Sequence, residues 1–189
     1  MVTQNTVISF EQLVQDFDSL FRQRVFRLET LDWYDAPNER EPYARFLAGE
    51  PASLAWREPW KRLVRDVRTS GRIMQRVHVV TEPVNDYIRF ELLHVYPANV
   101  DAGEDVRVMG MTAAEKAGFV LWDFWLFDDD VAALLSYEID GSVKSVQLTD
   151  GPIILPLLRD ARDKALNLAT PLAEYATEHN ITNERTRAA

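Results

Sequence analysis

The chain has 189 residues, of which 47% are hydrophobic, and its formal net charge is −9. Length and composition predict one domain over residues 1–179, with an ordinary hydrophobic core, and a flexible tail over 180–189. Cysteine is absent, which excludes disulfides, thiolate catalysis and cysteine–zinc sites, and the negative charge disfavours direct binding to nucleic acid.

The N-terminus has neither the basic start nor the apolar centre of a secretory signal. No apolar run reaches the roughly 18 residues of a membrane span. We therefore expect a cytoplasmic protein that does not contact membranes.

The first half of the chain alternates between helical and strand-like periodicity. Ser9 stands at capping-box spacing from Gln12, and Gly49 and Gly71 are suited to ending helices. The predicted elements are a helix from Ser9 to about Phe21, a strand over 24–31, a loop over 32–38, a short helix over 39–48, a helix from Trp56 to Gly71, and an interior strand over 73–81.

Residues 86–96 fit two patterns. Ile88, Leu92 and Val95 recur at helical spacing, and Asn85 or Asp86 could cap a helix. The same segment also alternates like a strand. We favour the helix and keep the strand as the alternative.

The second half predicts a short strand and then an antiparallel meander, with an Asp140–Gly141 hairpin turn and a long final helix. The predicted strands are 106–109, 119–127, 131–139 and 142–148, and the helix is 152–179, with a delayed start at Pro156 and a break at Pro171. The order of elements predicts a single α+β domain with a mixed sheet of about five to six strands, flanked by helices.

The most acidic segment contains Asp123 and the run Asp128–Asp130. Adjacent carboxylates suit a hard cation, so Asp128 and Asp129 are weak candidates for a metal site. Acidic residues also favour tight turns between strands, and we favour this interpretation. No cofactor is predicted, since the nucleotide-binding glycine motifs and the nucleophile elbow are missing.

Two residues are candidates for catalysis. His78 has the side chain best suited to acid–base chemistry near neutral pH, and Asp123 could orient it. The competing interpretation of His78 is a hydrogen-bonded core histidine, which is the more common role.

A second set of residues could contact a ligand. Arg76 and Arg89 could clamp a phosphate or carboxylate, since guanidinium groups pair well with such anions. Tyr87 and Glu91 are spaced by two from Arg89, and Trp125 lies beside Asp123. The alternative for Arg89 is an ordinary arginine–carboxylate pair.

Residues 57–76 carry seven basic side chains against two acidic ones, and several form one stripe on the predicted helix. A solvated helix face is the simplest explanation. If the stripe binds anything, an acidic protein surface or a nucleic acid backbone is the natural partner, and binding to nucleic acid would weaken with salt.

Six phrases of the chain resemble an uncharacterised actinobacterial family, domain of unknown function 6879. They are RLETL (27–31), RFLAGE (45–50), QRVHVV (75–80), DYIRFE (86–91), AGEDVR (102–107) and DFWLFDD (123–129). The resemblance extends from about Phe21 to Tyr175. It implies a regulatory or interaction role, because members are often encoded near helix-turn-helix regulators.

A much weaker similarity links the order of elements to one half of a phospholipase D-like unit. Such enzymes need a His-x-Lys pair, which this chain lacks. Two hypotheses follow. The first is a non-enzymatic module that binds another protein, for instance a DNA-binding regulator. The second is an enzyme, or a degenerate one, that binds a phosphorylated or nucleotide-like ligand.

Overall fold

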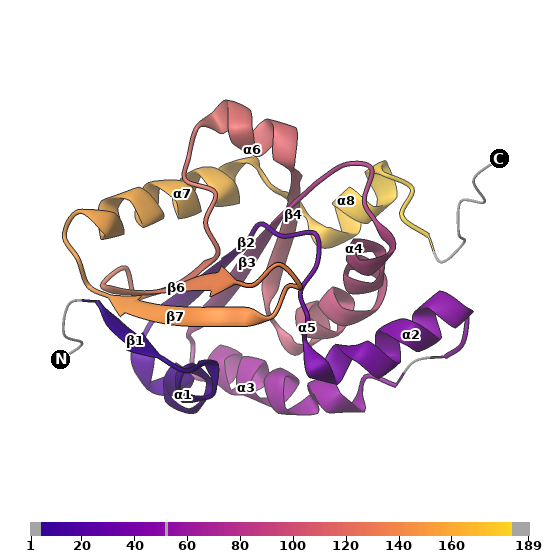
Figure 1. The fold of residues 1–189 in the computed structure, drawn as a ribbon, viewed down its shortest axis with the longest axis horizontal. Helices are drawn as coiled ribbons and strands as arrows, with labels where there is room; N and C mark the ends of the chain where they lie inside the picture. The colour runs from indigo at the N-terminus through magenta and orange to yellow at the C-terminus, as the bar shows by residue number, and fades with distance from the viewer. Residues whose placement is uncertain (1–4, 52, 183–189) are drawn as a thin grey trace.

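The computed structural model describes residues 5–51 and 53–182. One mixed sheet forms its centre, in the strand order β1-β7-β6-β5-β2-β3-β4-β8 (Figure 1). The strands are β1 (Thr6–Ile8), β2 (Arg24–Glu29), β3 (Ile73–Val80), β4 (Asp105–Gly110), β5 (Phe124–Phe127), β6 (Val131–Tyr137), β7 (Val143–Thr149) and β8 (Thr170–Pro171).

Helices cover both faces of the sheet, above and below it in Figure 1. The α-helices are α1 (Phe10–Asp16), α2 (Arg40–Ala48), α3 (Glu58–Thr69), α4 (Asp86–Phe90), α5 (Tyr96–Ala102), α6 (Met111–Ala117), α7 (Ile154–Leu168) and α8 (Leu172–Glu178). Three 3-10 turns, η1 (Phe17–Leu20), η2 (Pro37–Glu39) and η3 (Ala55–Arg57), and one π-helix, η4 (Glu91–Val95), complete the list. No helix in the described part of the chain has the length and apolar character needed to span a bilayer.

The mixed α+β fold is confirmed, but the predicted number of strands is wrong, because the sheet has eight strands and not five to six. The two strands that the sequence did not predict, β1 and β8, lie at the edges and have three and two residues. A segment this short shows no alternation of apolar and polar residues, so periodicity cannot detect it.

Strand β5 is shorter than its predicted range of 119–127, because the chain joins the sheet only at Phe124. The predicted two-residue hairpin turn is also wrong. Glu138 N–H donates to the Ser142 carbonyl, which encloses a three-residue loop ending in Gly141 at φ 86°. A glycine with positive φ is typical of such three-residue loops.

Residues 86–96 are helical, as favoured, with the Asn85 side chain accepting from Ile88 N–H. The helix widens to the π-form in η4 just before Pro97. Proline has no N–H and crowds the carbonyl of the fourth residue before it, which accounts for a local irregularity here. The predicted final helix divides into α7 and α8 at Pro171, whereas α6 was not predicted.

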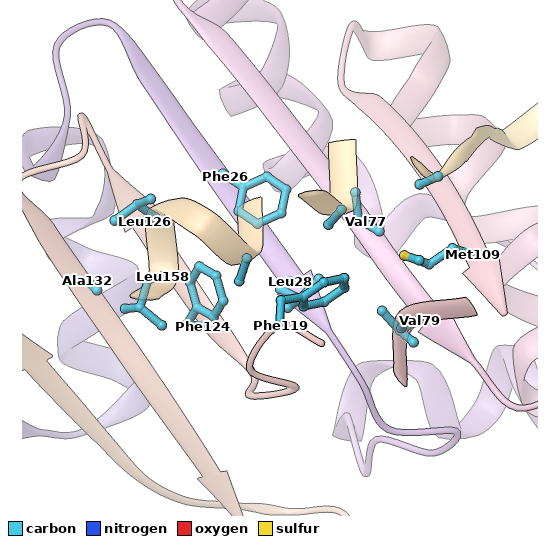
Figure 2. Close-up of a cluster of buried hydrophobic side chains, with 14 of the residues drawn as sticks. Phe26, Leu28, Val77, Val79, Met109, Phe119, Phe124, Leu126, Ala132 and Leu158 are labelled. Carbon is cyan, nitrogen blue, oxygen red and sulfur yellow. The ribbon is translucent and has the colours of Figure 1, made fainter. Parts of the chain in front are cut away.

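One face of the sheet is wholly apolar at its centre. Phe26 and Leu28 of β2, Val77 of β3 and Leu158 of α7 belong to one buried apolar cluster (Figure 2). Figure 2 also shows Phe124 and Met109 in the same layer. Successive side chains of a strand point to opposite faces, so the residues between these apolar positions form the other face.

Candidate functional site

The other face of the sheet carries buried charges between two apolar clusters. Val25 and Met74 belong to the cluster under α1 and α3, and Val80 to the cluster under α4 and α5. Between them lie the buried polar residues of β2 and β3, which are Arg27, Glu29, Arg76 and His78.

Two arginines and their carboxylates form a connected network. Nη1 of Arg76 lies 2.6 Å from Oε1 of Glu29, and Nε of Arg76 donates to Glu104 at 2.8 Å. Nη2 of Arg27 donates to Asp123 at 2.7 Å, and both guanidinium groups lie over the Trp125 indole. Each of these six residues is less than 10% exposed.

The register of the sheet explains why carboxylates have to lie beside the two arginines. Arg27 is paired with Arg76 on one side and with Trp125 on the other. Like charges on neighbouring strands repel each other, and buried charges need partners. Burial disfavours the charged form of Glu29, but Arg76 and Arg27 outweigh it and hold the pKa of Glu29 well below its ordinary value.

Asp123 is held by several donors at once. Its Oδ2 accepts from the backbone N–H of Thr30 at 3.0 Å and from the Thr30 hydroxyl at 2.7 Å. Its Oδ1 accepts from Arg27 and, at 2.8 Å, from the Tyr34 hydroxyl. A carboxylate has about four acceptor positions, so Asp123 can accept all of these bonds. It therefore links the end of β2 to the start of β5.

His78 is completely buried, and both ring nitrogens have partners. Nε2 lies 2.9 Å from the Leu31 carbonyl and Nδ1 lies 2.7 Å from the Tyr96 hydroxyl, which donates to Glu29 at 2.9 Å. A carbonyl only accepts, so Nε2 carries a proton. The Tyr96 hydroxyl therefore links the His78 ring to the Glu29 carboxylate inside the core.

A groove of about 780 Å³ lies where β5 begins. β5 starts at Phe124, but its neighbours on both sides extend further and leave a space between them. β6 continues to Tyr137 on one side of this space, and the segment that follows β2 lies on the other side. The lining comes from three segments, Thr30–Trp33, Leu121–Asp123 and Leu134–Ile139, together with Asn85 and Gly141.

The face of the sheet that the chain connections cover changes at this groove. The connections between β2, β3 and β4 pack on the charged face, whereas α6 packs on the apolar face before the chain reaches β5, next to β2. The groove lies at the carboxyl end of β2.

The walls of the groove are aromatic and acidic. Trp33 and Trp122 are 39% and 46% exposed, and Ile139 is completely exposed at the rim. Asp32, Asp123 and Glu138 contribute carboxylates, and the described lining residues include no lysine, arginine or histidine. Trp33 is fixed by donating its indole N–H to the Asp140 carbonyl at 2.8 Å and by edge-on packing against Tyr87.

The structure brings several predicted site residues together and separates others. Arg76, His78, Asp123 and Trp125 belong to the buried network described above. Arg89 does not meet Arg76, because it lies on α4, where it pairs with Asp86 at 3.0 Å and donates to the Thr182 carbonyl.

Tyr87 and Glu91 lie in a neighbouring buried cluster with Glu39. The Tyr87 hydroxyl donates to Glu39 at 2.8 Å. Burial and the nearby Glu39 carboxyl raise the pKa of Glu91 well above its ordinary value, and burial likewise raises the pKa of Glu39. Among the described residues, Oε1 of Glu91 is buried without a hydrogen-bond partner.

Asp128 and Asp129 stabilise the turn after β5. The Asp128 carboxylate accepts from the backbone N–H groups of residues 22–24, and Asp129 pairs with Arg24 at 2.7 Å and with Arg162. In the part of the chain that the structure describes, no three histidine or acidic side chains are grouped to hold a metal ion.

Sequence reasoning missed Arg27, Glu29, Tyr96 and Glu104 as members of the network. Arg27 and Glu29 alternate with apolar residues, which is typical of a strand with one face in solvent. Their position in the sheet could have identified them. Helices cover both faces of this sheet, so charged residues on either face need partners inside the protein.

The comparisons with known proteins give a family and no activity. No curated protein matches the chain, and the similarity to a phospholipase D-like unit is not shown. The model of domain of unknown function 6879 matches residues 10–177, which include every strand of the sheet except β1. The chain belongs to the family of domain of unknown function 6879.

Proposed function

We propose that this protein is a non-enzymatic, regulatory interaction module and that a segment of a partner protein binds in the groove at the start of β5. The observation that carries the proposal is the contrast between the groove and the network beneath it. The groove exposes Trp33, Trp122 and Ile139, and exposed apolar surface of this kind is typical of protein contacts.

The groups that could perform acid–base chemistry are engaged in internal contacts. Both ring nitrogens of His78 are bonded inside the core, and both oxygens of Asp123 accept from protein donors. A general base must reach the proton that it removes, and His78 is completely buried.

The alternative function, an enzyme or degenerate enzyme that binds a phosphorylated or nucleotide-like ligand, has less support. Phosphate is recognised by arginine, lysine and helix N-termini. Arg76 is bonded to Glu29 and Glu104 in the core, and the described lining of the groove contributes carboxylates and no cationic side chain.

We place this interaction in the cytoplasm, with a DNA-binding regulator as the partner to examine first. The net charge of −9 supports contact with the regulator over contact with DNA, because the field of the chain repels phosphate.

Photo-crosslinking in the native host tests the proposal. A photoreactive residue at position 139 samples the rim of the groove, and one at position 153, which is also highly exposed but directly precedes α7, is the matched control. We expect a specific partner to crosslink through position 139 and not through 153. The same products from both positions, or none from 139, would contradict binding in the groove.

A further inference from the structure

We infer that the groove binds an extended peptide segment and takes up one lysine or arginine side chain of that segment between its indoles and carboxylates. This inference rests on the proposed function and adds to it the conformation and the charge of the partner.

The shape of the groove favours an extended segment. The last backbone bond between β5 and β6 runs from Leu135 N–H to the Asp123 carbonyl at 2.9 Å, and β6 then continues to Tyr137 with no further strand paired on that side among the described residues. Strands two positions apart in a sheet are about 9.6 Å apart, which leaves room for one strand between them. Peptides commonly bind by adding a strand to such an edge.

The chemistry of the walls favours a cation. The exposed indoles of Trp33 and Trp122 offer electron-rich faces, which attract ammonium and guanidinium groups. Asp32, Asp123 and Glu138 line the groove together with these indoles.

Of the three carboxylates, Asp32 is the one without a cationic partner among the described residues. Arg27 neutralises Asp123, and Lys144 pairs with Glu138 at 3.3 Å on the exposed surface. Asp32 has no cationic partner among the described residues; its Oδ1 accepts from the backbone N–H of Thr81. A negatively charged segment would therefore meet carboxylates without a compensating cation in the described lining.

Three short acetylated and amidated peptides test the inference. Their sequences are identical and β-forming, except that the central residue is arginine, neutral citrulline or glutamate. Binding is followed by NMR of the ¹⁵N-labelled chain through the indole N–H signals of Trp33 and Trp122, which Trp33→Phe and Trp122→Phe assign.

We expect the arginine peptide to shift both indole signals and to bind about tenfold more tightly than the citrulline peptide, with no measurable binding of the glutamate peptide. In the double variant Asp32→Asn, Glu138→Gln, the advantage of arginine over citrulline should disappear. Asparagine keeps the oxygen that accepts from Thr81. Glu115→Gln, at an exposed position of α6, is the control and should change nothing.

Two results would overturn the inference, and each is separable from the proposed function. If arginine and citrulline peptides bind the groove equally, cation recognition is wrong while docking in the groove stands. If no peptide shifts the two indole signals, the extended-segment inference fails. The crosslinking comparison of positions 139 and 153 then decides independently whether a folded partner uses the groove.

Discussion

The two faces of the sheet are both covered by helices, but different forces hold them. Under α6 and α7 the contacts are apolar, with Phe124 and Leu158 completely buried. On the opposite face Arg27, Arg76 and Glu29 interrupt the apolar surface. An apolar contact loses stability in proportion to the volume removed, whereas a buried charge that loses its partner retains its full desolvation penalty.

The largest effect that we predict is on the charged face. Arg76→Leu should lower the free energy of unfolding by about 4 kcal/mol, because Glu29 and Glu104 both lose the ion pair with the Arg76 guanidinium in the core. Urea denaturation followed by circular dichroism measures this. A loss below about 1.5 kcal/mol would show that the two carboxylates do not depend on Arg76.

The pH dependence of that variant sharpens the comparison. The lowered pKa of Glu29 gives wild-type stability that is present above its ordinary value of 4.5 and is lost as the pH falls toward the pKa in the folded chain. In Arg76→Leu much of this contribution is absent. The difference in the free energy of unfolding between wild type and variant should therefore decrease below pH 4.5 and stay constant from pH 6 to 8.

On the apolar face, Leu158→Ala should cost about 3 kcal/mol through lost burial and the cavity that remains. No titrating group contributes, so we expect the same loss at pH 5 and pH 8. A loss that changes with pH by more than about 1 kcal/mol would contradict the separation of the two faces.

Tyr96→Phe should cost about 2 kcal/mol, since the hydroxyl joins His78 to Glu29 and its removal leaves both without that partner in the core. The ¹⁵N signals of the His78 ring should also change, because the bond to Nδ1 is gone. Unchanged His78 signals would show that the hydroxyl does not bond to the ring in solution.

Glu91→Gln should have the smallest effect, no more than about 1 kcal/mol at pH 6, because glutamine resembles the protonated acid. The raised pKa of Glu91 means that wild-type stability is full below 4.5 and decreases as the pH rises toward the pKa in the folded chain. The variant should therefore gain stability relative to wild type as the pH rises from 4.5 toward the pKa of Glu91 in the folded chain. If the free energies of unfolding of variant and wild type differ by the same amount over this range, the raised pKa of Glu91 is contradicted.

Much of the fold could be predicted from periodicity. The six longer strands and the helical state of 86–96 each contain enough residues to show a period. The edge strands β1 and β8 do not, because their pairing depends on the neighbouring strands β7 and β4.

The candidate site was less predictable. His78, Asp123, Arg76 and Trp125 could be singled out by residue type, but their partners come from positions far apart in the chain, such as Glu104 for Arg76. The groove was not predictable at all, since it exists only because β5 starts at Phe124 while its neighbours continue.

A double-mutant cycle on Arg76→Leu and Glu29→Leu tests most directly whether the buried charged groups pair with one another. If they do, no charged group of the network is available to bind a ligand. We predict that the double variant is more stable than the sum of the two single losses implies, by at least about 2 kcal/mol. Losses that simply add would contradict the account and would return Arg76 to the list of residues available for an anion.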